Sequence, residues 1–317
     1  MVAPLEFENH IAELESKLNG LRNFSGDGDL DIAKEVAKLE TKLQKLMETK
    51  YANLSPWEKV QVARHPERPH FKDYLENLFT DFEDLAGDRV FGEDRALFGG
   101  LAKFNDQGVM VIGLEKGNDT ESRIKHNFGM PRPEGYRKAA RLMQMAEKFN
   151  LPVIAFVDTS GAHPGLEAEE RGQAEAIAKS IETMMTLTVP TIVIVTGEGG
   201  SGGAIAIAVG NHVHMLEHSI YSVVSPEGCA SILWRTSDKK EEAAAAQKFT
   251  AQDLKALQVI DKIIPEPLGG AQRNHGMTYV NVRAALENSL DSLSSKTPDE
   301  LKTDRKTKFL AMGKVGL

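Results

Sequence analysis

The chain has 317 residues, of which 41% are hydrophobic and 26% charged, and its formal net charge at pH 7 is −8. This composition is typical of a soluble globular protein, and the acidic balance argues against nucleic acid as the main partner. A single cysteine, Cys229, excludes a disulfide within the chain, argues against a cysteine-based zinc site and is typical of a reducing compartment.

The N-terminal residues contain neither a basic stretch nor an apolar run, so the sequence predicts no signal peptide. The most apolar windows are too short and too rich in glycine to span a bilayer. We therefore expect a cytoplasmic protein without a membrane partner.

Apolar residues at helical spacing predict two helices near the N-terminus. One stripe covers residues 11–21 and the other residues 32–46, with a glycine- and aspartate-rich break between them. The two helices would form an antiparallel hairpin whose stripes pack either on the rest of the chain or against a partner protein. A further helix is expected at residues 74–85. We assign residues 1–88 to an N-terminal helical extension and residues 89–317 to a second domain that ends in helices.

Two similar segments predict an α/β fold with parallel strands. Each begins with a proline, Pro152 or Pro190, continues as a short buried strand and ends in a glycine-bearing turn. An alanine-rich helix over residues 169–187 separates them, and such a repeat of strand, turn and helix predicts stacked units. The other expected elements are strands at 109–114, 213–216 and 219–224, and helices at 136–149, at 228–234 and from about residue 251.

The turn after the second strand holds five glycines in seven residues and fits three patterns. The spacing Gly197-x-Gly199-x-x-Gly202 matches the dinucleotide-binding fingerprint. The spacing Gly199-x-Ser201-x-Gly203 matches the nucleophile elbow of serine hydrolases. In the third interpretation, backbone N–H groups at the start of a helix near Gly203 bind negative charge.

The first two interpretations have weaker support. The fingerprint normally follows the first strand of its domain, whereas here strand units precede it, although Glu217 lies about 20 residues further on, as the fingerprint requires. A hydrolase needs a histidine and an acid, and nothing singles out His275 with Asp253 or Asp261. The many glycines favour a backbone that approaches a ligand closely. Close packing of helix on strand without a ligand is the remaining alternative.

Six segments resemble the alpha subunit of the carboxyltransferase of bacterial-type acetyl-CoA carboxylase. In chain order they are RHPERPHFKDYLENLF, NFGMPRPEGYRKAARLMQMAEKF, AEERGQAEAIA, GEGGSGGAIAIAVG, YSVVSPEGCASILW and IIPEPLGGA. The resemblance runs from about residue 5 to about residue 300.

The resemblance implies the crotonase fold, a superhelix of strand–strand–helix turns, with helical additions at both ends. It implies transfer of a carboxyl group from carboxybiotin, held on a separate biotin carboxyl carrier protein, to acetyl-CoA, which gives malonyl-CoA for fatty acid biosynthesis. It also implies a beta subunit of the same fold, which binds zinc and completes the active sites in an α2β2 tetramer, with biotin carboxylase in the larger complex. No cofactor or metal is expected on this chain.

The resemblance also implies a function for the glycine-rich turn. Negative charge develops on two carbonyl oxygens during the transfer, and backbone N–H groups stabilise it without a titrating side chain. By resemblance, Gly202 and Gly203 are catalytic and form an oxyanion hole for the biotin carbonyl, while the beta subunit serves the thioester. Ser201 then becomes a spacer rather than a nucleophile. The residues expected to line the cleft are Gly161, Ala162, Gly199, Gly200 and Ser201.

The turn after the first strand, DTSGAHPG at residues 158–165, departs from the family pattern DTPGAYPG. Ser160 replaces a proline, which puts the local rigidity in doubt. His163 replaces an aromatic residue and adds a group that can titrate near neutrality. The expected backbone role of Gly161 and Ala162 depends on neither change.

Several charged residues have two interpretations each. The residues Glu169, Arg171 and Arg137 either border the biotin site or the beta interface, or are ordinary helix-surface charges. The basic residues between 123 and 141 either bind the phosphates of coenzyme A or form a solvated face.

His212, His214 and His218 have the spacing of a metal site if one strand carries them, although the polar face of a strand is favoured. Cys229 is expected near a helix start, where its thiol is either acidic or simply packed.

Two other functions stay open. A crotonase-like hydratase or isomerase that acts alone needs a carboxylate as acid and base, and Glu198 is the candidate. A non-catalytic scaffold would only complete the beta subunit.

Overall fold

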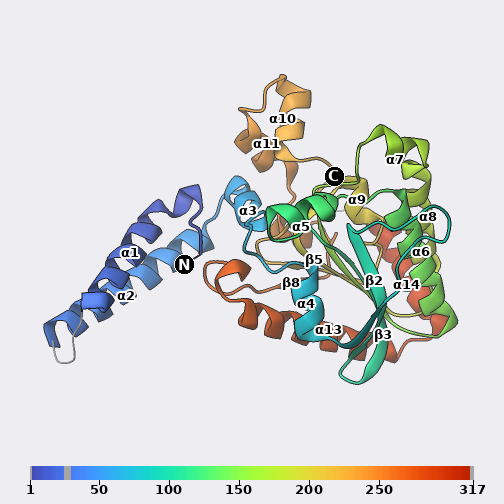
Figure 1. The fold of residues 1–317 in the computed structure, drawn as a ribbon, viewed down its shortest axis with the longest axis horizontal. Helices are drawn as coiled ribbons and strands as arrows, with labels where there is room; N and C mark the ends of the chain where they lie inside the picture. Colours follow the sequence, from blue (N-terminus) through green and yellow to red (C-terminus); the bar gives the residue numbers. More distant parts are fainter. Residues whose placement is uncertain (1, 25–29, 315–317) are drawn as a thin grey trace.

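One mixed sheet forms the centre of the computed structural model, which describes residues 2–24 and 30–314 (Figure 1). Its strands are β1 (Thr80–Asp84), β2 (Leu97–Phe104), β3 (Gln107–Leu114), β4 (Val153–Thr159), β5 (Thr191–Gly200), β6 (His212–Leu216), β7 (Ile220–Ser222) and β8 (Lys262–Ile264). The order is β1-β2-β3-β4-β5-β6-β8, and β7 pairs with β5. The first two pairings are antiparallel and all later ones are parallel, so the predicted parallel strand units are confirmed.

Helices cover both faces of this sheet. They are α1 (Asn9–Phe24), α2 (Leu30–Ala52), α3 (Pro56–Ala63), α4 (Phe71–Leu78), α5 (Thr120–Lys125), α6 (Pro133–Lys148), α7 (Leu166–Glu170), α8 (Gln173–Thr186), α9 (Ser201–Ile205), α10 (Pro226–Trp234), α11 (Lys240–Gln247), α12 (Ala251–Ala256), α13 (His275–Ser294) and α14 (Pro298–Ala311). Three short 3-10 turns are Glu6–Glu8, Asn127–Gly129 and Ala271–Arg273.

The two faces of the sheet hold separate hydrophobic cores. Helices α6, α8 and α12 pack on one face, and α4 and α13 pack on the other. Strand β4 supplies both, since Ala155 and Val157 face the first core while Ile154 and Phe156 face the second. Burial on both faces explains why these strands are continuous apolar runs rather than alternating ones.

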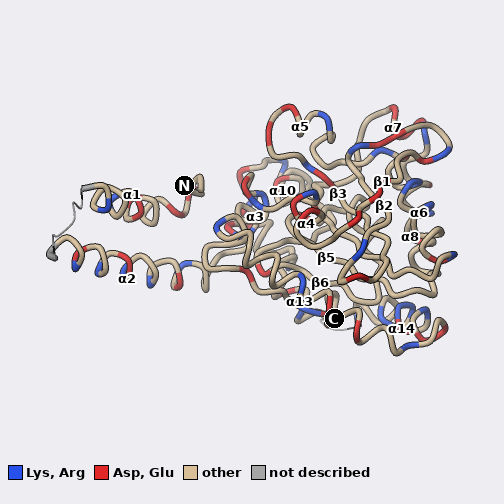
Figure 2. The backbone as a smooth tube through the Cα atoms, turned by 60° about the horizontal axis from the view of Figure 1, so that its bottom comes forward, with Lys and Arg blue, Asp and Glu red and all other residues tan. Residues whose placement is uncertain are grey.

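The N-terminal helices α1 and α2 form the predicted antiparallel hairpin, which projects from the body of the molecule (Figures 1 and 2). At its base, Tyr51 Oη donates to the buried carboxylate of Glu8 at 2.8 Å. Arg273, which precedes α13, donates to Glu8 at 2.9 Å and to Glu15 at 2.5 Å. The base of the hairpin is therefore attached to the body by ion pairs.

The predicted helix over residues 74–85 is confirmed as far as Leu78 and is wrong beyond it. Helix α4 ends at Leu78, and β1 follows at Thr80–Asp84 and pairs with β2. Phe79 adopts extended backbone angles, and its ring packs on Phe104 at 5.6 Å between centroids. Tertiary packing thus overrides the helical spacing of the apolar residues. The division of the chain at residue 88 stays a prediction, although β1 lies on its N-terminal side and belongs to the sheet.

Helix starts that matter for the site have strong local signals. Ser225 caps α10 by accepting the Gly228 N–H at 3.1 Å, and Pro226 occupies the first helical position. Helices α10 and α11 protrude above the sheet, on the same side of the molecule as α7 and α9 (Figure 1). Within the described ranges, no helix is long and apolar enough to cross a membrane.

Candidate functional site

The glycine-rich segment forms the end of β5 and the start of α9. Up to Val195, β5 pairs regularly with β4, but the next pair joins Thr159 to Gly199, which marks a β-bulge in β5. Beyond the bulge, β5 pairs with β7 instead of β6. The strand predicted to stop before the glycines therefore continues through Gly200, and the helix predicted near Gly203 begins at Ser201.

The turn after β4 lies directly against this segment. A Cβ atom on Gly200 would lie 2.1 Å from the Ser160 carbonyl oxygen, and one on Gly203 would lie 2.5 Å from the Ala162 nitrogen. Such distances leave no room for a side chain, so these two glycines permit contact between two backbones. The residues expected to form one cleft, from Gly161 and Ala162 to Gly203, are thus brought together.

The first N–H groups of α9 have no hydrogen-bond partner in the protein that the structure describes. In a helix, the first amides have no carbonyl partner in the preceding turn. Within the described part of the chain, the N–H groups of Gly202 and Gly203 donate to no protein acceptor. Ser201 has a φ of +50°, an unusual angle for a residue other than glycine, at the point where strand becomes helix.

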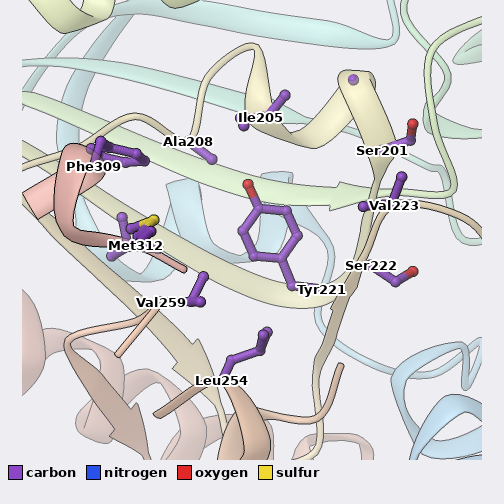
Figure 3. A pocket seen from close by; sticks show the side chains of 12 residues that line it. Ser201, Ile205, Ala208, Tyr221, Ser222, Val223, Leu254, Val259, Phe309 and Met312 are labelled. Carbon is purple, nitrogen blue, oxygen red and sulfur yellow. The ribbon is translucent and has the colours of Figure 1, made fainter. Parts of the chain in front are cut away.

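An apolar cavity of about 380 Å³ opens beside Gly202 (Figure 3). Ser201 lies at one end, Tyr221 lies in the middle, and Phe309 and Met312 from the C-terminal end of the chain lie on the other side. Gly202 also lines the cavity. The rest of the lining is Ile205, Ala208, Val213, Ser222, Val223, Leu254 and Val259. Such a surface next to free backbone amides suits an apolar ring or chain that carries a polar end.

A second cavity, of about 280 Å³, lies between the turn after β4 and α8. His163, Glu169 and Ile177 are among its lining residues, and Ile177 is also the nearest neighbour of a Cβ atom placed on Gly202, at 3.5 Å. The His163 Nε2 atom lies 2.7 Å from the Glu167 Oε1 atom, so the ring is tied to α7. The histidine that replaces the aromatic residue of the family pattern at position 163 therefore adds a hydrogen bond to Glu167.

Of the three charged candidates, Arg137 and Arg171 are engaged inside the protein. Both donate to Glu134, at 3.0 and 2.7 Å respectively, and Arg137 also donates to Asp88 at 2.7 Å. Glu169 is exposed and lines the second cavity. Of the three candidates, Glu169 is thus the one that lines a cavity beside the turn after β4.

A charged cavity of about 220 Å³ lies on the other side of the turn after β4. At its base, the buried carboxylate of Asp158 is 2.6 Å from the Lys116 Nζ atom and 3.7 Å from the His70 Nδ1 atom. Burial raises the pKa of Asp158, but Lys116 and His70 outweigh it and hold this pKa well below its usual range. Sequence reasoning missed this cluster, because the three residues come from distant segments.

Glu198, the candidate acid and base of a hydratase, is held at the same cavity. Its Oε1 atom accepts from the Arg64 guanidinium at 2.7 and 3.1 Å, and its Oε2 atom is 3.8 Å from Lys116. Its side chain is 7% exposed. A carboxylate fixed in this way is poorly placed to exchange protons with a substrate.

The residues nominated for a serine hydrolase do not form a catalytic triad. His275 interacts with the Glu67 carbonyl oxygen at 2.8 Å. Asp253 accepts from Thr250 at 2.7 Å, and Asp261 accepts from Lys308 at 2.7 Å. Ser201 therefore has no paired histidine and acid among these candidates.

The three histidines with metal-like spacing separate in space. The rings of His212 and His214 lie 5.6 Å apart, whereas His218 packs against Tyr51. In residues 2–24 and 30–314, no three His, Cys, Asp or Glu side chains are grouped so that they could hold a metal ion. Cys229 is half-buried within α10, three residues after its first position.

Solved structures share the fold at low sequence identity. The chain resembles transcarboxylase 12S with a TM-score of 0.59 and 19% identity, over 72% of this chain and 42% of that one. It resembles the beta subunit of Pseudomonas aeruginosa geranyl-CoA carboxylase with a TM-score of 0.56 and 18% identity, over 80% of this chain and 45% of that one. The expected fold, that of the carboxyltransferase domains, is confirmed.

Sequence comparison is far more specific. Residues 4–313 match the family model described as "Acetyl co-enzyme A carboxylase carboxyltransferase-like". The acetyl-coenzyme A carboxylase carboxyl transferase subunit alpha of Rhizorhabdus wittichii is 58% identical, over 99% of this chain and 100% of its own length. That of Paramagnetospirillum magneticum is 56% identical, over 99% of each chain. The chain therefore belongs to the family of alpha subunits of the acetyl-CoA carboxylase carboxyltransferase.

Proposed function

We propose that this subunit transfers the carboxyl group of carboxybiotin to acetyl-CoA together with a beta subunit, and that its own contribution is the pair of N–H groups of Gly202 and Gly203. One observation carries the proposal: these two adjacent amides have no acceptor in the described chain, and Gly202 lines an apolar cavity. Malonyl-CoA is the product, and fatty acid biosynthesis is its use.

The chemistry requires stabilised oxyanions rather than a strong base on the protein. When the carboxyl group leaves biotin, the ureido group becomes an anion and can take a proton from the acetyl methyl group. The resulting enolate attacks the carboxyl carbon. Fixed N–H groups aimed at the developing charge lower the barrier, and one such donor is typically worth about 3 kcal/mol.

The surroundings of Gly202 and Gly203 support this assignment. The apolar cavity beside Gly202 would receive the ring of biotin, with its polar ureido group toward the amides. Gly161 and Ala162 pack directly against the backbone of Gly203 and would hold its N–H group in place. Gly199, Gly200 and Ser201 then set the path of the backbone through the cleft rather than acting on substrate through side chains.

Exposed apolar residues on α10 and α7 are suited to contact the proposed partners. On α10, Ile232 is 73% exposed and Leu233 63%, and Leu166 at the start of α7 is 72% exposed. Large exposed apolar side chains of this kind are typical of a protein interface. We assign this surface to the beta subunit, in an α2β2 assembly in which beta carries the zinc and its oxyanion site serves the thioester. The carrier protein and biotin carboxylase complete the proposed complex.

Co-expression with the cognate beta subunit tests the proposal. The purified pair should form malonyl-CoA from acetyl-CoA and the carboxylated carrier protein, while either subunit alone should be inactive. Absence of transfer by a correctly assembled pair would contradict the proposed function. Hydration of an enoyl-CoA by this chain alone would instead favour the hydratase alternative, which the fixed position of Glu198 disfavours.

A further inference from the structure

The bulge in β5 changes the partner of that strand at the site. Before the bulge, residues 192–195 pair with β6, and after it, residues 198–200 pair with β7. A bulge bends its strand and redirects the residues that follow. On the side of β4, the backbone of residues 196–198 has no ladder partner, and its polar groups need other partners because these residues are buried.

Two buried charged side chains provide those partners. Asp158 Oδ1 accepts the Glu198 N–H at 2.8 Å. The Arg68 guanidinium donates to the Thr196 carbonyl oxygen through Nε at 3.2 Å and Nη2 at 2.7 Å. A Cβ atom on Gly197 would lie 2.5 Å from the same Asp158 Oδ1 atom, so the carboxylate fills the space that the glycine leaves.

Each of these side chains is fixed by an opposite charge. Lys116 lies 2.6 Å from Asp158, and Glu266 accepts two hydrogen bonds from Arg68, at 2.8 and 2.9 Å. Glu266 in turn accepts from the backbone N–H of His218 and Ala271. Charged groups of this kind are costly to bury unless they are paired and hydrogen-bonded, and both pairs meet that condition.

We propose that Asp158 and Arg68 are positioning residues that hold the bulge of β5 and so fix the direction of the Gly202 and Gly203 N–H groups. Neither side chain touches the reacting atoms. The catalytic consequence rests on the proposed function, whereas the effect on the conformation of the glycines does not.

Selective ¹⁵N labelling of the 27 glycines gives a readout that is independent of activity. In Asp158→Ala, the amide resonances of Gly197, Gly199, Gly202 and Gly203 should shift or broaden, while those of distant glycines stay in place. With the beta subunit, kcat should fall by about 100-fold and KM for acetyl-CoA should change by less than about 3-fold.

Two further variants separate the hydrogen bond from the charge. The double variant Asp158→Asn, Lys116→Met keeps an acceptor for the Glu198 N–H and removes both charges, so it should restore most of the glycine spectrum and of kcat. Arg68→Lys cannot reproduce both bonds to Thr196 and should disturb the same glycines. Glu8→Gln changes another buried carboxylate, which pairs with Arg273 at the hairpin base, and should leave these resonances unchanged.

Unchanged resonances of these glycines in folded Asp158→Ala or in Arg68→Lys would overturn the proposal. The proposal would also be overturned if the variants lost activity only in proportion to the fraction of protein that is unfolded. If the glycine spectrum responds as expected but the wild-type pair transfers no carboxyl group, the positioning role stands and the proposed function fails.

Discussion

Gly202 and Gly203 are adjacent, but a side chain would meet different surroundings at the two positions. A Cβ atom on Gly202 would make ordinary contact with Ile177 at 3.5 Å. One on Gly203 would lie 2.5 Å from both the Ala162 nitrogen and the Gly161 carbonyl carbon. Because neither atom belongs to a flexible side chain, the turn after β4 would have to move.

We therefore expect Gly203→Ala to lower carboxyl transfer by about 100-fold or more, which is the range for loss of one oxyanion donor. Steady-state kinetics of the alpha–beta pair measures the effect, with thermal unfolding as the test of folding. Gly108→Ala is the matched control, since its Cβ atom would meet only Leu151, at 3.4 Å, far along the chain from the turn. Full activity of Gly203→Ala would contradict the assigned role.

His214 makes stability depend on pH. Burial lowers its pKa to about 4, and its Nε2 atom lies 2.8 Å from Ser289 Oγ. The unfolded chain binds a proton near the ordinary histidine pKa of about 6.5, whereas the folded chain resists protonation until about pH 4. The free energy of unfolding is therefore highest above pH 6.5 and falls as the pH drops from about 6.5 toward 4.

His214→Gln should reduce this acid dependence. Urea unfolding of the wild type and the variant at several pH values would show a shallower slope for the variant between pH 6.5 and 4, by as much as about 3 kcal/mol over the interval. The difference between the two curves isolates His214 from the other histidines. Parallel curves would show that His214 does not cause the dependence.

The residues of the site differ in how far the sequence could predict them. Gly202, Gly203, Gly161 and Ala162 follow from motif and resemblance, and the structure brings the two turns together. The partners of Asp158 did not follow, because Lys116 and His70 reach it from segments with no shared motif. A sequence pattern within one segment predicts the backbone geometry of that segment. The contacts between distant segments depend on how the whole chain packs.

At the scale of elements, the buried cation of Arg305 helps to attach α14 to the rest of the molecule, beside Lys308, which donates to Asn211 and Asp261. Arg305 is fully buried, and its guanidinium donates to the carbonyl oxygens of Met184 and Leu187 at 2.9 and 2.8 Å and to Asn211 Oδ1 at 2.7 Å. Burial lowers its pKa to about 10, so the group stays charged at neutral pH. The last turn of α14 also carries Phe309 to the apolar cavity.

Arg305→Met should destabilise the protein by roughly 3 kcal/mol or more, because several buried acceptors would lose their donor. Chemical denaturation measures the change, and Lys302→Met, at an exposed position of the same helix, is the control for helix propensity. A change of less than about 1 kcal/mol for Arg305→Met would mean that water or another donor replaces the guanidinium.

The elements that the sequence predicted best are those buried on both faces. The strand units after Pro152 and Pro190 appear as β4 and β5, and the helix between them is divided into α7 and α8. Short edge elements such as β8 and the strand β1 were missed. Their few residues carry little periodic signal, and their pairing with neighbours decides their conformation.

At the scale of the whole molecule, the proposed site lies on one side of the body, and the hairpin of α1 and α2 projects from another. The turns after β4 and β5, together with α7, α9 and α10, lie at the carboxyl side of the parallel strands (Figure 1). The hairpin of α1 and α2 extends away from the body (Figures 1 and 2). The proposed beta subunit would complete the site on the side that carries these turns.

The exposed residues of α10 give the last prediction. The double variant Ile232→Asp, Leu233→Asp places two charges on side chains that are 73% and 63% exposed, so the isolated subunit should fold with an unchanged melting temperature. If this surface binds beta, the two charges would have to be desolvated in the complex, and Kd should rise by about 10-fold or more.

Titration of labelled beta subunit measures the affinity, and transfer activity at low subunit concentration should fall in parallel and recover when beta is in excess. Val280→Asp is the matched control, since Val280 is 60% exposed on α13, which lies on the opposite side of the body (Figure 1). Equal affinity of the α10 variant and the wild type would place the beta subunit elsewhere. A loss of affinity for the α10 variant, but not for Val280→Asp, would support binding of the beta subunit at α10, on the same side of the molecule as the proposed site.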